Sequence, residues 1–524
     1  MVRHALGLFI SLAGVAVVTF LGVQVFPVNA TTVAFAYLLL PQFLHRTRKA
    51  AYWIAPSLLT VVLYWPGLMA WFQKDDFVWL KLLDIARKSQ GFRWALFTPL
   101  AQGTIRTLSE RVFFMSFSAL FGVNALPYRC WALLTFAASL VVVSSLCARL
   151  TGSRAAGFWA AILWTVNSSM GVALSWTAIY YEILCSLFLL GGIWLLVRYA
   201  ESGQRRFYLA QWITFVIGFG VLELNVVYPA LAAAYALCCN RRLLAKIWPM
   251  FLVSAAYTLI HTVAAPLPAG GPYKLHWDTS VLSTLWTYWK WALGPNRLIY
   301  LRIYPSPYRS LLTILLMSGL LGFLLCKMLR REWVTAFFAA WFVIVLAPLL
   351  PLRDHIDPSY LTIPLAGFAM WGGWAVVSGW NAGRLGRIAA VFLLGIYLAV
   401  SIPIARVTTL SFYDGSQAVR SFVLGIVART RGQESKLVLL RNVDSEMFWS
   451  AVYDRPFPLF GINEVYLLPD DQQKIVPEVP ASIRSQFFAD SGMLRAAFEQ
   501  QRAIVLDTAG GHVRDVTASY VRSH

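Results

Sequence analysis

Residues 51–71, AYWIAPSLLTVVLYWPGLMAW, form an apolar run, and residues 74–77, KDDF, place two adjacent acids just after it. A helix of about 20 residues crosses the ~30 Å hydrocarbon core of a bilayer, so Asp75 and Asp76 are expected at the mouth of a membrane. Like charges this close raise one another's pKa, and partial burial adds to the effect. The pair is therefore either a solvated helix N-terminus, where the helix dipole stabilises acids, or a functional site. Aromatic residues on both sides indicate an interface and favour a function.

Similar apolar runs recur along the 524 residues, and the composition indicates a membrane protein. Hydrophobic residues make up 59% of the chain and charged residues only 13%, about half the charged share of a globular protein. The mean hydropathy is +0.63. We therefore predict a polytopic α-helical membrane protein with about thirteen spans. They are 5–26, 31–45, 51–71, 129–150, 154–175, 182–199, 207–223, 225–239, 246–264, 309–326, 333–350, 358–378 and 387–405.

The basic residues of the short loops predict the orientation of these spans. Lys and Arg gather at one set of alternate loop ends, which we assign to the cytoplasm. Among the acids of residues 1–405, only Glu201 and Glu332 fall on that side, and the others converge on the outer side. Two long outer segments, 72–128 and 265–308, carry basic amphipathic stretches that we predict to be interfacial helices. The net charge of +20 lies in this membrane part, which indicates attraction to lipid headgroups and no nucleic-acid partner.

The character of the sequence changes from about residue 406. The long apolar runs stop, and acidic and basic residues balance. We expect a helix at 416–430, a buried strand at 436–441, a helix at 493–501 and a strand at 503–507. Alternating elements of this size predict a small α/β domain. The chain is thus divided into a transmembrane domain, 1–405, and a soluble extracytoplasmic domain, 406–524.

Two further acids lie at or near predicted spans on the outer side. Glu182 opens a span, and Glu223 lies between two leucines. An ionisable group at such a depth usually faces the bundle interior or a water-filled cavity. The alternative for Glu223 is an acid exposed in a short loop at a helix end.

The outer loop 352–360 contains several ionisable groups, among them Arg353, His355 and Tyr360. An Arg, a His and a Tyr at one membrane face suit a phosphate oxygen, because Arg offers a planar pair of donors. The alternative is that Arg353 only pairs with Asp354 or Asp357. One His among scattered acids does not make a zinc signature.

Together these features resemble the GT-C glycosyltransferases, which are polytopic enzymes that use polyprenyl- or dolichyl-phosphate sugars. The resemblance covers roughly residues 50–405 and is strongest for a bacterial branch similar to protein mannosyltransferases and lipid A aminoarabinose transferases. The chain departs from that branch in having Asp-Asp where Asp-Glu is frequent, and in an additional N-terminal hairpin. The features that carry the resemblance are the outer Asp75-Asp76, the interfacial helices at 76–90 and 107–121, Glu182, Leu222-Glu223 before Tyr228-Pro229-Ala230, the stretch from Arg353 to Gly367, and the external C-terminal domain.

The resemblance implies inverting sugar transfer from a polyprenyl-phosphate donor to a glycan, lipid or protein hydroxyl, on the periplasmic side of a bacterial inner membrane. Asp75 is the expected general base, with Asp76 orienting the acceptor or taking the proton instead. The developing charge on the lipid phosphate calls for basic groups. Our candidates for binding the substrates are Arg106, Arg111, Arg353, His355, Tyr360, Glu182 and Glu223.

No cofactor is required for this chemistry, and although some relatives use a divalent metal, these residues do not indicate one. The competing hypothesis is a polytopic transporter or a flippase for a lipid-linked sugar. A secondary transporter would more often show interrupted helices in two repeated halves, and the sequence has no such repeat.

Overall fold

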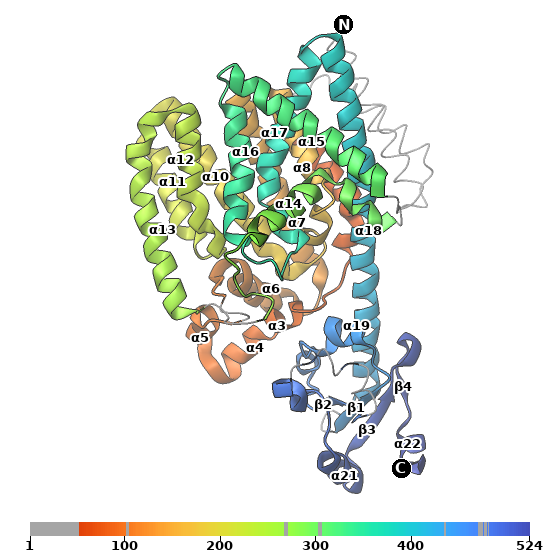
Figure 1. Cartoon of the computed structure of the whole chain (residues 1–524). Coiled ribbons are helices and arrows are strands. Elements are labelled where there is room, and N and C mark those ends of the chain that lie inside the picture. Colours follow the sequence, from red (N-terminus) through yellow and green to blue (C-terminus); the bar gives the residue numbers. More distant parts are fainter. Residues whose placement is uncertain are drawn as a thin grey trace.

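The computed structural model describes residues 52–100, 104–266, 271–301, 306–433, 436–469, 475, 479 and 481–523. The described chain is mostly helical, and a small sheet lies below a helical bundle (Figure 1). The spans expected at 5–26 and 31–45, which form the additional N-terminal hairpin, lie outside the described residues.

The bundle is built from apolar helices, and the chain is a membrane protein. In the described part, five helices are long and apolar enough to cross a membrane: Ala125–Thr151, Thr177–Ser202, Arg241–Ala264, Pro307–Leu329 and Arg384–Thr430. The apolar helices Tyr52–Leu68, Glu223–Cys239 and Val334–Leu349 are shorter. The expected number of thirteen spans therefore stays a prediction. The labelled helices are α7 (Ala125–Thr151), α8 (Arg154–Val166), α10 (Tyr180–Ser202), α11 (Arg205–Gly218), α12 (Tyr228–Cys239), α13 (Leu244–Ala264), α15 (Ser306–Leu329), α16 (Val334–Leu346), α17 (Pro364–Asn381) and α18 (Arg384–Thr430).

One expected span is interrupted. The run 154–175 was expected to be continuous, but α8 ends at Val166 and a separate short helix, α9 (Met170–Ala173), follows. The break is held by the buried Asn167, whose Nδ2 donates to the carbonyl oxygen of Ala292 at 2.9 Å and to Tyr397 Oη at 2.8 Å. A polar side chain with two such partners stabilises irregular backbone inside the bundle.

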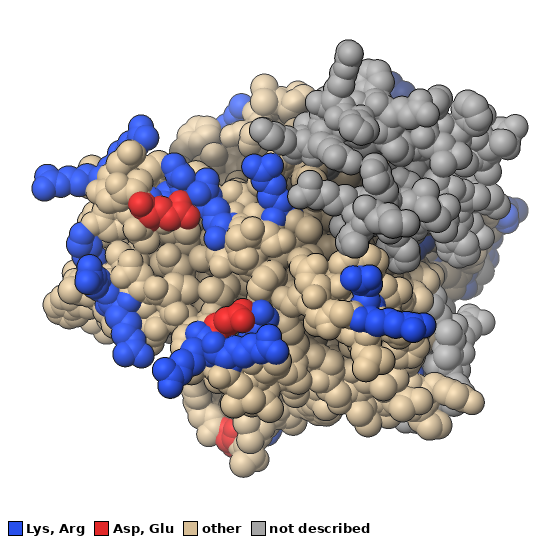
Figure 2. Space-filling model, turned by 90° about the horizontal axis from the view of Figure 1, so that it is seen from above, with Lys and Arg blue, Asp and Glu red and all other residues tan. Residues whose placement is uncertain are grey.

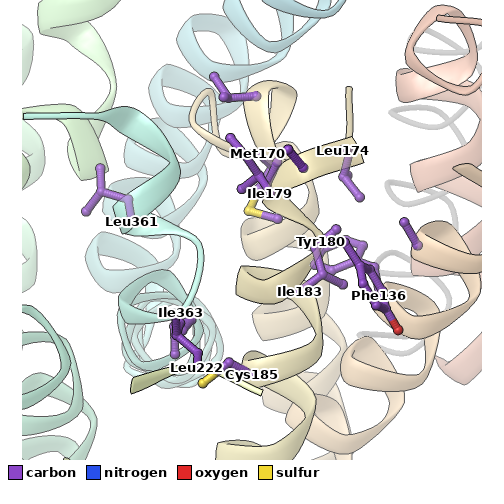
Figure 3. Packing of buried hydrophobic residues seen from close by; sticks show 14 of the residues in the cluster. Phe136, Met170, Leu174, Ile179, Tyr180, Ile183, Cys185, Leu222, Leu361 and Ile363 are labelled. Atoms are coloured by element: carbon purple, nitrogen blue, oxygen red, sulfur yellow. The ribbon is translucent and has the colours of Figure 1, made fainter. Parts of the chain in front are cut away.

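Helix α17 lies in the middle of the bundle, and every residue from Pro364 to Gly373 is buried. Gly373 lets it approach α8 closely, because a Cβ there would lie 2.6 Å from the backbone of Ala156 and Ala160. Small residues at such contacts are typical of membrane helices. Figure 3 shows part of the surrounding core, with Phe136 of α7 beside Tyr180 and Ile183 of α10.

Short helices lie at the end of the bundle that faces the sheet (Figure 1). Both outer segments that were expected to contain interfacial helices form helices, and their position at a membrane surface stays a prediction. The first segment contains α3 (Asp76–Leu80), α4 (Leu82–Ile85), η1 (Ala86–Gln90), α5 (Gly91–Phe97), η2 (Thr107–Val112) and α6 (Phe113–Phe121), and the second contains α14 (Ser280–Leu293) and η6 (Pro295–Leu301).

The C-terminal part forms a four-stranded sheet in the order β2-β1-β3-β4. Strand β1 (Leu437–Arg441) pairs in parallel with β2 (Val465–Leu467) and β3 (Ala503–Asp507), and β4 (Arg514–Asp515) is antiparallel to β3. The two central strands and the helix α21 (Ser491–Glu499) lie close to where the sequence predicts them. The composition change at residue 406 falls inside α18, which continues from the bundle to the sheet (Figure 1).

Basic side chains gather on the bundle face that is turned away from the sheet (Figure 2). The helix junctions that the sequence assigns to the cytoplasm are rich in Lys and Arg. The two acids expected there are both paired: Glu201 Oε2 lies 2.9 Å from Arg149 Nη1, and Glu332 Oε2 lies 2.5 Å from Lys327 Nζ.

Candidate active site

The two adjacent acids have different environments. Asp76, the first residue of α3, is completely buried. Its Oδ1 accepts a hydrogen bond from the backbone N–H of Ala178 at 2.7 Å, and its Oδ2 accepts one from the N–H of Gln73 at 3.1 Å. Burial raises the pKa of Asp76 to about 7, against the opposing effects of Arg129 and these two bonds. Asp76 therefore fixes its loop to η3 (Thr177–Ile179) and has no exposed surface to offer a substrate.

Asp75 is exposed, although the residues around it are mostly buried. Its carboxylate caps no helix N–H and accepts no bond from another residue in the part of the chain that the structure describes. Desolvation by the surrounding protein raises the pKa of Asp75, and the charge of Asp357 adds to this, while Lys74 and Arg106 act in the opposite direction. An accessible carboxylate with a raised pKa and unoccupied lone pairs can accept a proton.

The Asp75 loop is held by residues more than 300 positions later in the chain. Sequence reasoning missed these contacts, because nothing in the local pattern of either segment indicates the other. Three of them come from the lower part of α18, and two come from the carbonyl oxygens of Ser450 and Asp454, next to the sheet. The bonds are Gln417 Nε2 to Met69 O (3.2 Å), Trp71 N to Ser416 Oγ (2.9 Å), Gln73 Nε2 to Phe412 O (3.4 Å), Lys74 N to Ser450 O (2.8 Å) and Lys81 Nζ to Asp454 O (2.6 Å).

Arg106 lies at the centre of a group of acids. Its Nε lies 3.0 Å from Glu223 Oε2, and its Nη1 lies 2.7 Å from Glu110 Oε1. The guanidinium also lies over the ring of Tyr181, at 3.9 Å from the centroid. Glu110 was not among the expected site residues, although it follows Arg106 at the four-residue spacing that pairs charges along a helix. Burial raises the pKa of Glu110 to about 7.

Two expected site residues share the electrostatic environment of Arg106. Glu182 is buried at the start of α10, and its Oε2 has no hydrogen-bond partner in the described part of the chain. Tyr360 lies near enough to Tyr181, Glu182 and Arg106 to interact with them electrostatically. The structure therefore brings together Asp75, Arg106, Glu182, Glu223 and Tyr360 at one end of the bundle.

The other expected basic residues have partners that differ from those expected. Arg111 is fully buried and donates to the carbonyl oxygens of Ala95 at 3.0 Å and Thr104 at 2.8 Å, so it holds the backbone of its own segment. Arg353 is exposed and pairs with Asp278 at 3.0 Å and with Asp354 at 3.6 Å. The contact with Asp354 belongs to the alternative that the sequence left open, while Asp278 was not expected as a partner, and phosphate binding by Arg353 stays a prediction.

His355 lies between two tyrosines. Its ring centroid is 4.3 Å from that of Tyr273 and 5.8 Å from that of Tyr360. Burial lowers the pKa of His355, which favours the neutral imidazole. The described residues contain no group of three or more His, Cys, Asp or Glu side chains that could hold a metal ion. The expectation that no cofactor is required stays a prediction.

The fold is shared with a solved oligosaccharyltransferase. The Archaeoglobus fulgidus oligosaccharyltransferase, tethered with an acceptor peptide containing the NVT sequon, aligns with 89% of this chain and 69% of its own at 11% identity and a TM-score of 0.52. The chain has the GT-C glycosyltransferase fold. ArnT from Cupriavidus metallidurans aligns in its apo state (11% identity, 91% of this chain and 94% of ArnT, TM-score 0.47) and bound to undecaprenyl phosphate (12%, the same coverages, TM-score 0.43). Both TM-scores lie under 0.5, so the fold assignment rests on the first alignment.

The sequence itself matches no protein-family model and no curated protein sequence. The resemblance to GT-C enzymes that the sequence suggests is thus confirmed at the level of the fold.

Proposed function

We propose that this chain is a membrane glycosyltransferase that moves a sugar from a polyprenyl-phosphate donor to a hydroxyl acceptor with inversion of the anomeric carbon. The observation that carries the proposal is the state of Asp75. It is an exposed carboxylate with unoccupied lone pairs and a raised pKa, at one end of a membrane bundle. A carboxylate of this kind could serve many proton transfers. The shared GT-C fold favours sugar transfer as the reaction that it serves.

The proposed step balances as a single displacement. The acceptor hydroxyl oxygen attacks the anomeric carbon, and the bond from that carbon to the phosphate oxygen breaks with its electron pair staying on the phosphate. Asp75 takes the acceptor proton. Proton transfer to a positioned base typically increases a reaction rate by ~10²–10⁴-fold. Attack from the face opposite to the leaving phosphate inverts the carbon.

The residues around Arg106 would bind the substrates. Glu223 and Glu110 hold the guanidinium over Tyr181, so Arg106 is fixed in position and can still donate from its remaining N–H groups. Glu182 has a buried carboxylate oxygen without a partner in the described chain, and sugar hydroxyls are donors of the kind it lacks. Tyr360 borders the same region.

We place the site and the C-terminal sheet on the periplasmic side of a bacterial inner membrane, because basic helix junctions gather on the opposite face. A periplasmic activity reporter fused after residue 524 should be active, and one fused at about residue 203 should be inactive. Activity only from the fusion at residue 203 would place the site on the cytoplasmic side and contradict this orientation.

The activity is tested with the purified full chain in proteoliposomes. Undecaprenyl phosphates carrying single hexoses or pentoses are added with a bacterial envelope extract as the acceptor source, and undecaprenyl phosphate is measured by mass spectrometry. The wild type should release it from at least one donor, while Asp75→Asn should release at most about one hundredth as much. Equal release by both proteins would contradict the proposal. Movement of an intact donor across the bilayer without release would instead support the flippase alternative.

A further inference from the structure

We propose that Lys74 binds the phosphate of the lipid-linked donor, an inference that rests on the proposed function. A leaving phosphate requires a nearby cation. Two cations act electrostatically on Asp75, namely Arg106 and Lys74. Arg106 is held by two carboxylates. Lys74 has no carboxylate within ion-pair distance in the described ranges, so its positive charge is not neutralised by an acid.

The backbone of Lys74 has an unusual conformation for a lysine. Its φ is 55°, in the left-handed region, which is unfavourable for a residue with a Cβ. The N–H of Lys74 donates to the carbonyl oxygen of Ser450 at 2.8 Å, and this bond helps to hold the conformation. Glycine would adopt the same conformation without the cost. A lysine that is held in this conformation at a site is consistent with a role for its side chain.

The side chain of Lys74 lies against aromatic rings. Its Nζ is 4.8 Å from the ring centroid of Trp176 and 5.7 Å from that of Phe412. Aromatic faces attract an ammonium and leave its net charge in place. The two rings pack on each other at 6.2 Å, so the ammonium rests on a fixed surface. An anion that approaches the ammonium from the side away from the rings would complete its set of hydrogen bonds.

The neighbouring position of the base fits this role. The base takes the proton of the attacking oxygen on one face of the anomeric carbon and the phosphate leaves from the other face, so both groups have to lie next to the same sugar carbon. Lys74 and Asp75 are consecutive residues, and the loop that carries both is bonded to α18 and to Ser450. The charge of Lys74 lowers the pKa of Asp75. A phosphate bound to Lys74 would cancel this effect and strengthen the base when the donor is in place.

The test measures binding of undecaprenyl phosphate without a sugar, which needs no knowledge of the acceptor. The purified full chain in phosphatidylcholine nanodiscs is titrated with this lipid, and binding is followed by native mass spectrometry. Lys74→Met keeps the length of the side chain and removes its charge, so Kd should rise at least about 10-fold, as expected for the loss of one charge-assisted hydrogen bond. Lys74→Arg should restore most of the affinity.

Two further variants separate binding from stability. Lys74→Gly relieves the left-handed strain, so its melting temperature should stay at or above the wild-type value while binding is weakened as in Lys74→Met. Lys88→Met is the matched control, because Lys88 is exposed and pairs with Asp84 at 2.6 Å. It should bind undecaprenyl phosphate as the wild type does.

Wild-type affinity in both Lys74→Met and Lys74→Gly would overturn the assignment and leave the proposed function intact. A wild-type protein that binds no undecaprenyl phosphate would overturn both. Inorganic phosphate in large excess should not displace the lipid, because the bound group is the headgroup of an anchored chain. Displacement by free phosphate would overturn the lipid assignment.

Discussion

The different environments of Asp75 and Asp76 predict that their asparagine variants fail in different ways. In Asp76→Asn, the amide keeps one acceptor oxygen, and its NH2 group must face either the N–H of Ala178 or that of Gln73. One buried donor is then unsatisfied, where the wild type has bonds of 2.7 and 3.1 Å. A lost hydrogen bond to a charged group costs about 1.5–3 kcal/mol.

The cost of burying a charged Asp76 in the wild type reduces the loss of stability in Asp76→Asn. Its pKa is raised to about 7 by desolvation, so the folded state binds a proton that the unfolded state releases between its ordinary pKa and 7. The stability contributed by this group therefore falls as the pH rises through that window, and above pH 7 the buried charge is present in full. Asparagine carries no charge, so the variant avoids the cost of burying one at high pH. We therefore expect the loss of stability in Asp76→Asn at high pH to lie near the lower end of about 1.5–3 kcal/mol.

In Asp75→Asn, the side chain is exposed and no hydrogen bond is lost. The free energy of unfolding should change by less than about 0.5 kcal/mol, while sugar transfer should fall by ~10² or more. Thermal unfolding in detergent, followed by tryptophan fluorescence, is compared with release of undecaprenyl phosphate for both variants. A stable, inactive Asp76→Asn beside an active Asp75→Asn would exchange the two roles. Normal stability and turnover in both would contradict the assignment of the base to either acid.

Three further outcomes are expected. The transfer rate should rise with pH through the raised pKa of Asp75, because the base must be deprotonated, and Asp357→Asn should move this limb to lower pH by removing the negative charge that raises this pKa; a pH–rate profile that is unchanged in the variant would contradict this. Ser416→Ala removes the acceptor of the Trp71 N–H and should lower the turnover while the donor Kd changes little. Ser416→Thr keeps a hydroxyl and should recover the turnover, as measured by steady-state kinetics. Arg353→Ala breaks only exposed ion pairs and should cost about 0–1 kcal/mol of stability with no change in undecaprenyl phosphate binding; a weakened Kd would restore its role at the phosphate.

The elements of the fold that depend on local patterns could be predicted from the sequence. Strands at 436–441 and 503–507 were expected from short buried runs, and the structure has β1 at Leu437–Arg441 and β3 at Ala503–Asp507. The break after Val166 could not be predicted in the same way. It depends on Asn167 meeting Ala292 and Tyr397, which are 125 and 230 residues away in the chain.

The roles of charged residues were harder to predict than their presence. The sequence indicated Arg106, Arg111 and Arg353 equally as substrate-binding residues, because all three are arginines expected on the outer side of the membrane. The structure separates them by their partners, which are carboxylates for Arg106, backbone carbonyl oxygens for Arg111 and exposed acids for Arg353. A single sequence does not show which acids compete for which arginine, because the competing groups come from different helices.

The arrangement of the two adjacent acids also explains how one exposed carboxylate can be positioned without being hydrogen-bonded. Two neighbouring like charges cannot both be buried at low cost. Asp76 is buried with two backbone donors, and it ties the start of α3 to η3. Asp75 is covalently attached to this anchor, and the bond from Lys74 N to Ser450 O holds the loop from the other side. The Asp75 carboxylate is therefore confined by its neighbours, and its lone pairs stay available for the proton of an acceptor.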